Sequence, residues 1–338
     1  MDIAGHEKLI REHLFTDADR VLIRALCGAE FNKESADKLA RGLNIDKAES
    51  LYLLLLGIVG YRQGWEYFPE EGTPRFKGLH RYYQVRNAAE TASLKKRLEN
   101  LRSEGIPAML SGAAAARTYY LSDTPRMIDA YDVTVPSDKY KKAATVFDRD
   151  AAVSAVSETG QDLVKEPLFR LHRGSPDKRI FTERDLWKSA LKVNVLDSEV
   201  YVPSPEHSLL YQLCVPYGGW VTSERHTERV LRMFEALNLL GRDLNTKSFT
   251  ESAEKAGLSA VAKLYFTMLD EIVPERSRAS EFTHCFSADS FCSKYSKELS
   301  NLCQNTGSYS ESLSFTQRLS LYLEKKRIQK MLEKQRNF

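Results

Sequence analysis

The chain has 338 residues, of which 42% are hydrophobic and 28% charged, and its formal net charge is +3. These values are typical of an ordinary soluble globular protein with one large domain or two modest ones. The near-neutral charge argues against a dedicated nucleic-acid binder, which usually carries a strong basic stripe. No apolar run is long enough to cross a bilayer and no secretory signal opens the sequence, so we expect a cytoplasmic protein without a membrane partner.

The five cysteines are loosely spaced and form no Cys-x-x-Cys pair. Scattered reduced thiols are the expected state for a cytosolic chain of this size. The alternative is a zinc site made by His284, Cys285, Cys292 and Cys303. A basic cluster between Lys325 and Arg336 favours the solvated end of a helix, with a patch for RNA or a protein partner as the second interpretation.

The first region, residues 1–104, is predicted to be helical. Asp17 or Asp19 is expected to cap its first helix. Apolar residues at helical spacing predict a further helix over Lys47–Phe68, and the Pro, Glu and Gly residues of Pro69–Gly78 predict a polar loop.

A long helix is then expected over His80–Glu104. Its inner face should carry the alanines and leucines at helical spacing, which are Ala88, Ala89, Ala92, Leu94, Leu98 and Leu101.

The pattern changes in the second region, residues 105–203, where short apolar runs alternate with short helical stretches. The expected elements are a strand at Ile106–Leu110, a helix at Ala113–Leu121, a strand at Ala130–Val135, a helix at Ser137–Phe147 capped by Ser137, a strand at Pro167–His172 and a hairpin over Leu191–Val202. We predict one small mixed sheet, with Val133–Val135 central and Leu168–Leu171 beside it.

The third region, residues 204–338, returns to helical patterning. The expected helices begin with the segment Pro205–Val215 and continue with Ser223–Leu240, Thr246–Ala256, Ser259–Ile272 and Ser314–Arg336. A small sheet between two helical regions predicts an α+β fold rather than a long doubly wound sheet.

Several motifs of the middle region follow one another in a recognisable order. Gly105–Tyr120 combines an apolar run, a Gly turn and a helix of small residues, and Arg126–Pro136 reads as a strand that carries carboxylates. Two further segments follow, Leu168–His172 and Val200–Leu213. In this order, the four segments resemble those of the bacterial nucleotidyltransferase family 5, of the DNA polymerase beta-like superfamily. The resemblance covers roughly residues 40–270. It implies transfer of a nucleotidyl group from an NTP to an acceptor that the sequence does not identify.

The chemistry of such a site explains its residues. Two Mg²⁺ ions clamp the attacking and leaving oxygens of the phosphoryl group. An Asp-x-Asp pair on one strand points both carboxylates to one face, and a neighbouring strand supplies a third. The resemblance implies metal or catalytic roles for Asp132 and Asp129, and it places Ser111 and Gly112 where the Gly turn would offer backbone N–H groups to phosphate.

This sequence departs from that pattern at three positions. Ala130 stands where the first metal-binding Asp belongs, Arg170 stands in place of the third carboxylate, and Ser111 replaces a lysine before the glycine. In a regular strand Asp129 points away from Asp132, although a bulge could turn it inward. Mg²⁺ binding by the usual cradle is therefore in doubt.

Two functional hypotheses follow. In the first, the protein is an active enzyme that uses Asp132, Asp129 and Mg²⁺. In the second, it is a pseudoenzyme in which Arg126, Arg170 and His172 join Asp132 in a pocket that holds a nucleotide or phosphate directly, while the helical regions contact a partner. Plainer alternatives remain for each residue: a strand-end Asp132, a salt-bridged Arg126 and a structural His172. Either hypothesis predicts that Asp132 faces one cleft with Gly112 and Arg170.

Overall fold

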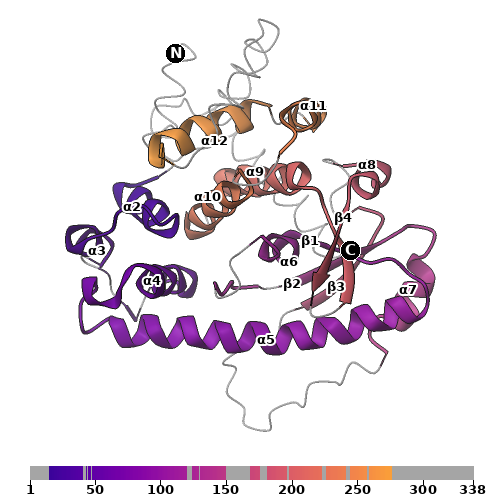
Figure 1. The fold of residues 1–338 in the computed structure, drawn as a ribbon, viewed down its shortest axis with the longest axis horizontal. Coiled ribbons are helices and arrows are strands. Elements are labelled where there is room, and N and C mark those ends of the chain that lie inside the picture. Colours follow the sequence, from indigo (N-terminus) through magenta and orange to yellow (C-terminus); the bar gives the residue numbers. More distant parts are fainter. Residues whose placement is uncertain are drawn as a thin grey trace, which may run out of the picture.

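The computed structural model describes residues 15–40, 43, 45–46, 48–119, 124–128, 130–149, 168–175, 181–195, 198–222, 226–240, 244–256 and 259–275. Within this part, five strands form a mixed sheet, with the long helix α5 along one side and a group of helices on the other (Figure 1). The predicted α+β class is confirmed. The predicted terminal helix, the basic cluster and the His284 to Cys303 group lie outside the described residues.

The described part of the N-terminal region is helical, as predicted, but the helix ends differ from the predicted ones. The helix bounds are α2 Asp17–Leu26, α3 Lys33–Ala40, α4 Ser50–Gln63, the short 3-10 helix η1 Trp65–Tyr67 and α5 Thr73–Ser103. Helix α2 is capped by Thr16 rather than by Asp17 or Asp19. The Thr16 hydroxyl accepts from the Asp19 backbone N–H, and the Asp19 carboxylate accepts from the Thr16 N–H at 2.7 Å, which completes a capping box.

Two expected boundaries around α4 and α5 were wrong. Helix α4 ends at Gln63 because Gly64 adopts a φ of 125°, which an α-helix does not allow. The predicted loop over Pro69–Gly78 is half helix, since α5 already begins at Thr73. Pro74 caused the misprediction: proline breaks a helix interior but suits the first turn, where no N–H partner is needed.

The inner face of α5 is partly polar. The three leucines predicted for this face are buried, whereas its three alanines are exposed. Asn87, Glu90 and Thr91 are buried instead, because each has a partner there. The Asn87 side chain pairs with the backbone N–H and C=O of Arg126 at 2.9 and 2.8 Å, and the Tyr131 hydroxyl donates to Glu90 at 3.1 Å.

The sheet has the strand order β3-β2-β1-β5-β4. Its strands are β1 Met109–Ser111, β2 Ala130–Val135, β3 Leu168–Arg173, β4 Leu191–Val195 and β5 Ser198–Val202. The pairs β1–β2 and β4–β5 are antiparallel, and β2–β3 and β1–β5 are parallel. The predicted mixed sheet, the placement of β2 beside β3 and the hairpin are confirmed. The predicted central place of Val133–Val135 is wrong, because β1 is the middle strand and β2 lies between β1 and β3.

The two faces of the sheet join different cores. Leu110 and Val133 pack in a cluster with α5 and helix α7, Tyr140–Val146. Met109, one residue before Leu110, belongs to the cluster formed by the surrounding helices. Ser137 does not cap α7 as predicted, because its N–H and hydroxyl both donate to Glu183 of helix α8, Glu183–Lys188.

The C-terminal helices complete the helical side of the molecule. They are α9 Pro205–Thr222, α10 His226–Leu240, α11 Thr246–Ala256 and α12 Ser259–Ile272. Their buried residues form one hydrophobic cluster with those of α2, α3 and α4, so the two ends of the described chain pack together (Figure 1). In the described part, no helix has the length and apolar character needed to cross a membrane.

Candidate functional site

Strand register brings the predicted site residues of the sheet onto one face. Ser111 of β1 lies opposite Asp132 of β2, which lies opposite Arg170 of β3. Directly paired residues point to the same face of a sheet, and so does His172, two residues after Arg170. We call the face made by Ser111, Asp132, Arg170 and His172 the polar face.

The centre of the polar face is a hydrogen-bonded pair. Oδ1 of Asp132 lies 2.7 Å from Nε2 of His172, and their side chains are 19% and 30% exposed. A carboxylate accepts only, so Nε2 carries the hydrogen and Nδ1 is the ring nitrogen left for another contact. This hydrogen bond fixes both side chains beside Arg170.

Gly112 brings the start of helix α6, Gly112–Arg117, against this pair. Its φ is +58°, and a Cβ added there would lie 3.2 Å from Oδ2 of Asp132 and 3.4 Å from the Tyr211 hydroxyl. The positive φ favours glycine, and a Cβ here would make a tight contact with the Asp132 carboxylate. Ser111 is buried, and its hydroxyl donates to the Asp132 carbonyl oxygen at 3.2 Å, so it joins β1 to β2.

Arg126 occupies a different environment from the one predicted. Its side chain is 4% exposed, and its Nε donates to Glu235 of α10 at 2.6 Å. Arg232 donates to the same carboxylate at 3.2 Å and to the Gln212 side-chain oxygen at 2.7 Å. Arg126 is thus a salt-bridged residue, as the plainer interpretation held, although the bridge is buried and not at the surface. Asp129 lies outside the described residues.

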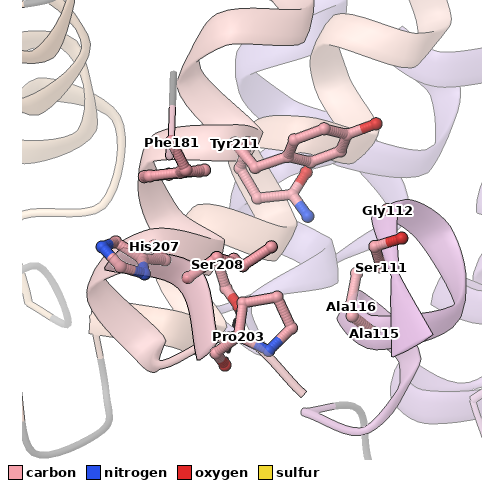
Figure 2. A pocket seen from close by; sticks show the side chains of 11 residues that line it. Ser111, Gly112, Ala115, Ala116, Phe181, Pro203, His207, Ser208 and Tyr211 are labelled. Carbon is pink, nitrogen blue, oxygen red and sulfur yellow. Dashed lines mark hydrogen bonds between the residues drawn. The ribbon is translucent and has the colours of Figure 1, made fainter. Parts of the chain in front are cut away.

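A hollow lies beside Gly112, between α6 and α9 (Figure 2). Its walls are Ser111, Gly112, Ala115, Ala116, Phe181, Leu186, Pro203, His207, Ser208, Tyr211 and Gln212. The hollow is narrow, and its enclosed part has space for about one water molecule. Figure 2 shows Ser111 and Gly112 on one side and Tyr211, Ser208 and His207 on the other.

The wall of this hollow carries no formal charge at neutral pH. His207 is its one residue that titrates near neutrality, and burial lowers the pKa of its imidazole below the ordinary 6.5. The Ser189 hydroxyl lies 3.1 Å from the carbonyl oxygen of Asp185, which can only accept, and 3.0 Å from Nδ1 of His207. Ser189 therefore donates to Asp185, and the neutral His207 donates from Nδ1.

The donors on the polar face do not fit a two-metal cradle. Mg²⁺ prefers several hard oxygen ligands, and bound pairs of these ions need bridging carboxylates. Ala130 and Arg170 occupy the two positions of this face where the resemblance implies carboxylates, and Asp132 is bonded to His172. Among the described residues, no group of three or more His, Cys, Asp or Glu side chains could hold a metal ion.

No protein-family model, curated protein or solved structure matches this chain.

Sequence reasoning missed the hollow. Phe181, Pro203, His207 and Gln212 are far from the Gly112 turn in the sequence, and none belongs to a catalytic motif. The available signal was the Val200–Leu213 segment, which places polar residues among the apolar positions of a helix that follows the last strand.

Proposed function

We propose that this protein binds a nucleotide or a related phosphorylated ligand on the polar face, on a nucleotidyltransferase-like core, without a two-metal cradle. The observation that carries the proposal is the register of β2 with β3, which sets Arg170 beside Asp132. Arg170 is exposed. A guanidinium presents two parallel N–H donors that match a phosphate, and it supplies charge that a metal ion would otherwise supply.

The order of the elements supports the same proposal. A strand, a Gly turn with a short helix, a carboxylate-bearing strand, a helix and a parallel strand follow one another as β1, α6, β2, α7 and β3. This is the order that the family resemblance implies. Helix α6 has six residues, so we assign phosphate binding to Arg170 rather than to the end of this helix.

The test is calorimetric titration of the full chain with ATP, GTP, CTP and UTP, each with Mg²⁺ and with EDTA. Binding should persist in EDTA. Arg170→Ala should weaken it about tenfold, the value of a charge-assisted hydrogen bond at an exposed position. Arg173→Ala is the matched control, because Arg173 is exposed on the same strand and points to the opposite face. Equal affinity of the wild type and Arg170→Ala would show that the ligand does not contact Arg170 on this strand.

A second function, Mg²⁺-dependent nucleotidyl transfer to an unidentified acceptor, is favoured by one observation. Asp132 still lies against the Gly112 turn, with Oδ2 at 3.2 Å from the position of a Gly112 Cβ. Ala130→Asp combined with Arg170→Glu would put three carboxylates on one face and should make nucleotide binding depend on Mg²⁺. If the unmodified protein releases pyrophosphate from NTPs only when Mg²⁺ is present, this second function replaces the first.

A further inference from the structure

Helix α5 turns a largely apolar strip away from the sheet. In Figure 1 this helix lies along one border of the fold, with the sheet on its inner side. Among the described residues, four large hydrophobic side chains are exposed, and two of them are Tyr82 and Val85 of α5, at 40% and 65%. We propose that this side of α5 is a docking surface for an acidic amphipathic helix of a protein partner.

The apolar residues on this side have the spacing of a helix–helix contact. We call them the outer strip: Gly78, Tyr82, Val85, Ala88, Ala89 and Ala92, all exposed. From Gly78 to Ala92, five of them follow in steps of four, three, four and three residues, the repeat with which one helix packs along another. The glycine and the alanines are small, so the backbone of a second helix can come close, while Tyr82 and Val85 supply large apolar contacts.

The charges around the outer strip have one sign. The exposed charged residues of α5 are all cations: Arg75, Lys77, Arg81, Lys96 and Arg102. The two carboxylates of this helix are already paired within it, Glu90 with Arg86 and Glu99 with Lys95. Arg81 lies beside the first turn of the strip and Lys96 one turn beyond its end, about 22 Å apart along the helix axis. The strip is therefore apolar in the middle and basic towards both ends.

This arrangement of charge and side-chain size distinguishes between partners. Two copies of the same face would set cations against cations, whether the helices ran parallel or antiparallel. A lipid surface gains little here, because Tyr82 and Val85 are the only large apolar side chains of the strip. A helix with large apolar residues along one side and carboxylates in its first and last turns matches both the strip and its cations.

The experiment measures the binding of two synthetic peptides to the full chain by fluorescence anisotropy. Both peptides are amphipathic helices of about 18 residues, long enough to span the strip, with leucines at three- and four-residue spacing. One carries Glu in its first and last turns, and the other carries Lys at the same positions. The wild type should bind the Glu peptide at least about tenfold more tightly than the Lys peptide, and added salt should reduce this preference.

Three variants assign the binding to the outer strip. Val85→Glu puts a carboxylate in the middle of the strip and should weaken the Glu peptide about tenfold. Arg81→Glu combined with Lys96→Glu should invert the preference, so that the Lys peptide binds more tightly. Lys188→Glu, at an exposed position on α8, is the matched control and should leave the Glu peptide within about twofold. Unchanged urea midpoints verify that the variants fold.

The outcomes decide between the occupants. Absence of binding by the Glu peptide, equal binding of both peptides, or unchanged affinity in Val85→Glu would overturn the docking surface. A dimer in sedimentation velocity that Val85→Glu dissociates would assign the strip to a second copy instead. Binding to vesicles of phosphatidylcholine and phosphatidylserine that Val85→Glu abolishes would assign it to a membrane, and either result overturns the proposal. Nucleotide binding on the polar face is tested separately and does not depend on these results.

Discussion

Asp132 shows how one side chain acquires a partner that its own segment of sequence does not reveal. Its carboxylate bonds to His172, which lies 40 residues later and two positions beyond its register partner Arg170. Three carboxylates on this face would repel one another without metal ions, whereas one carboxylate with an imidazole and a guanidinium does not need them. The residue types at positions 130 and 170 therefore decide the electrostatics of the whole face.

Gly112 leads to a prediction about the stability of the folded protein. Gly112→Ala should lower the free energy of unfolding by about 1–2 kcal/mol, because alanine at a φ of +58° is strained and its Cβ would press on Asp132. Urea unfolding measures the change. The matched control is Gly78→Ala in α5, where an added Cβ meets nothing within 4 Å. It should stabilise by up to about 1 kcal/mol. A loss at Gly78 as large as that at Gly112 would contradict the conformational explanation.

His207 gives a pH prediction. Burial lowers the pKa of the folded imidazole below 6.5, so the unfolded chain binds the extra proton first as pH falls. The stability contributed by neutral His207 is complete above about pH 6.5 and is lost as pH falls toward the folded pKa. Between about pH 7 and 5, the free energy of unfolding should fall more steeply in the wild type than in His207→Gln. Parallel curves from urea unfolding at each pH would show that burial of His207 has no such cost.

Buried ionic contacts join elements that the sequence separates. The segment before β2 supplies Arg126, α10 supplies Arg232 and Glu235, and α9 supplies Gln212. The network is almost fully buried, so its charges depend on one another and not on water. Because Gln212 also lines the hollow, the same contacts that hold α10 near the sheet orient a wall of the hollow.

Glu235→Leu should therefore destabilise the protein by about 3–5 kcal/mol, since it leaves two buried arginines without their shared carboxylate. The measurement is the urea midpoint and slope. Glu199→Ala, which breaks the exposed Lys192–Glu199 pair at 2.7 Å, is the control and should cost no more than about 1 kcal/mol. A similar small cost at Glu235 would mean that the network contributes little to stability.

The whole molecule is organised around a core that its two ends share. Residues of α2, α3 and α4 are in one hydrophobic cluster with residues of α9, α10, α11 and α12. The second cluster lies between the sheet and α5, and adjacent residues of β1 belong to different clusters. The helical regions before and after the sheet thus form one packed unit in the described chain.

Leu22→Ala tests this shared core. Leu22 of α2 is fully buried in the cluster, and its truncation should cost about 2–5 kcal/mol. The urea unfolding transitions followed by far-UV circular dichroism and by tryptophan fluorescence should move to lower urea together, because α2 cannot detach without exposing α10 and α12. Val85→Ala on the outer face of α5, where Val85 is 65% exposed, should change stability by about 0.5 kcal/mol or less. An early transition confined to the N-terminal helices would contradict a shared core.

Local patterns determined much of the fold. Alternation predicted β2, local strand patterns predicted β3 and the β4–β5 hairpin, and the predicted bounds of α11 and α12 are the observed ones. The same patterns failed where local preference and tertiary need differ. The α5 alanines were expected inside because they are apolar, yet Asn87 and Glu90 are buried there, since partners on distant segments satisfy their polar groups.

For the candidate site, the sequence by itself determined which charged side chains are present, Asp132 and Arg170. It also determined that a glycine, Gly112, stands where the turn needs a positive φ. Only the tertiary structure decided their partners. It paired Asp132 with His172, brought Arg126 into a buried salt bridge with Glu235, and formed the hollow from three separate segments. The physical reason is that backbone conformation follows from near neighbours, whereas hydrogen-bond partners and cavities follow from strand register and helix packing across the whole chain.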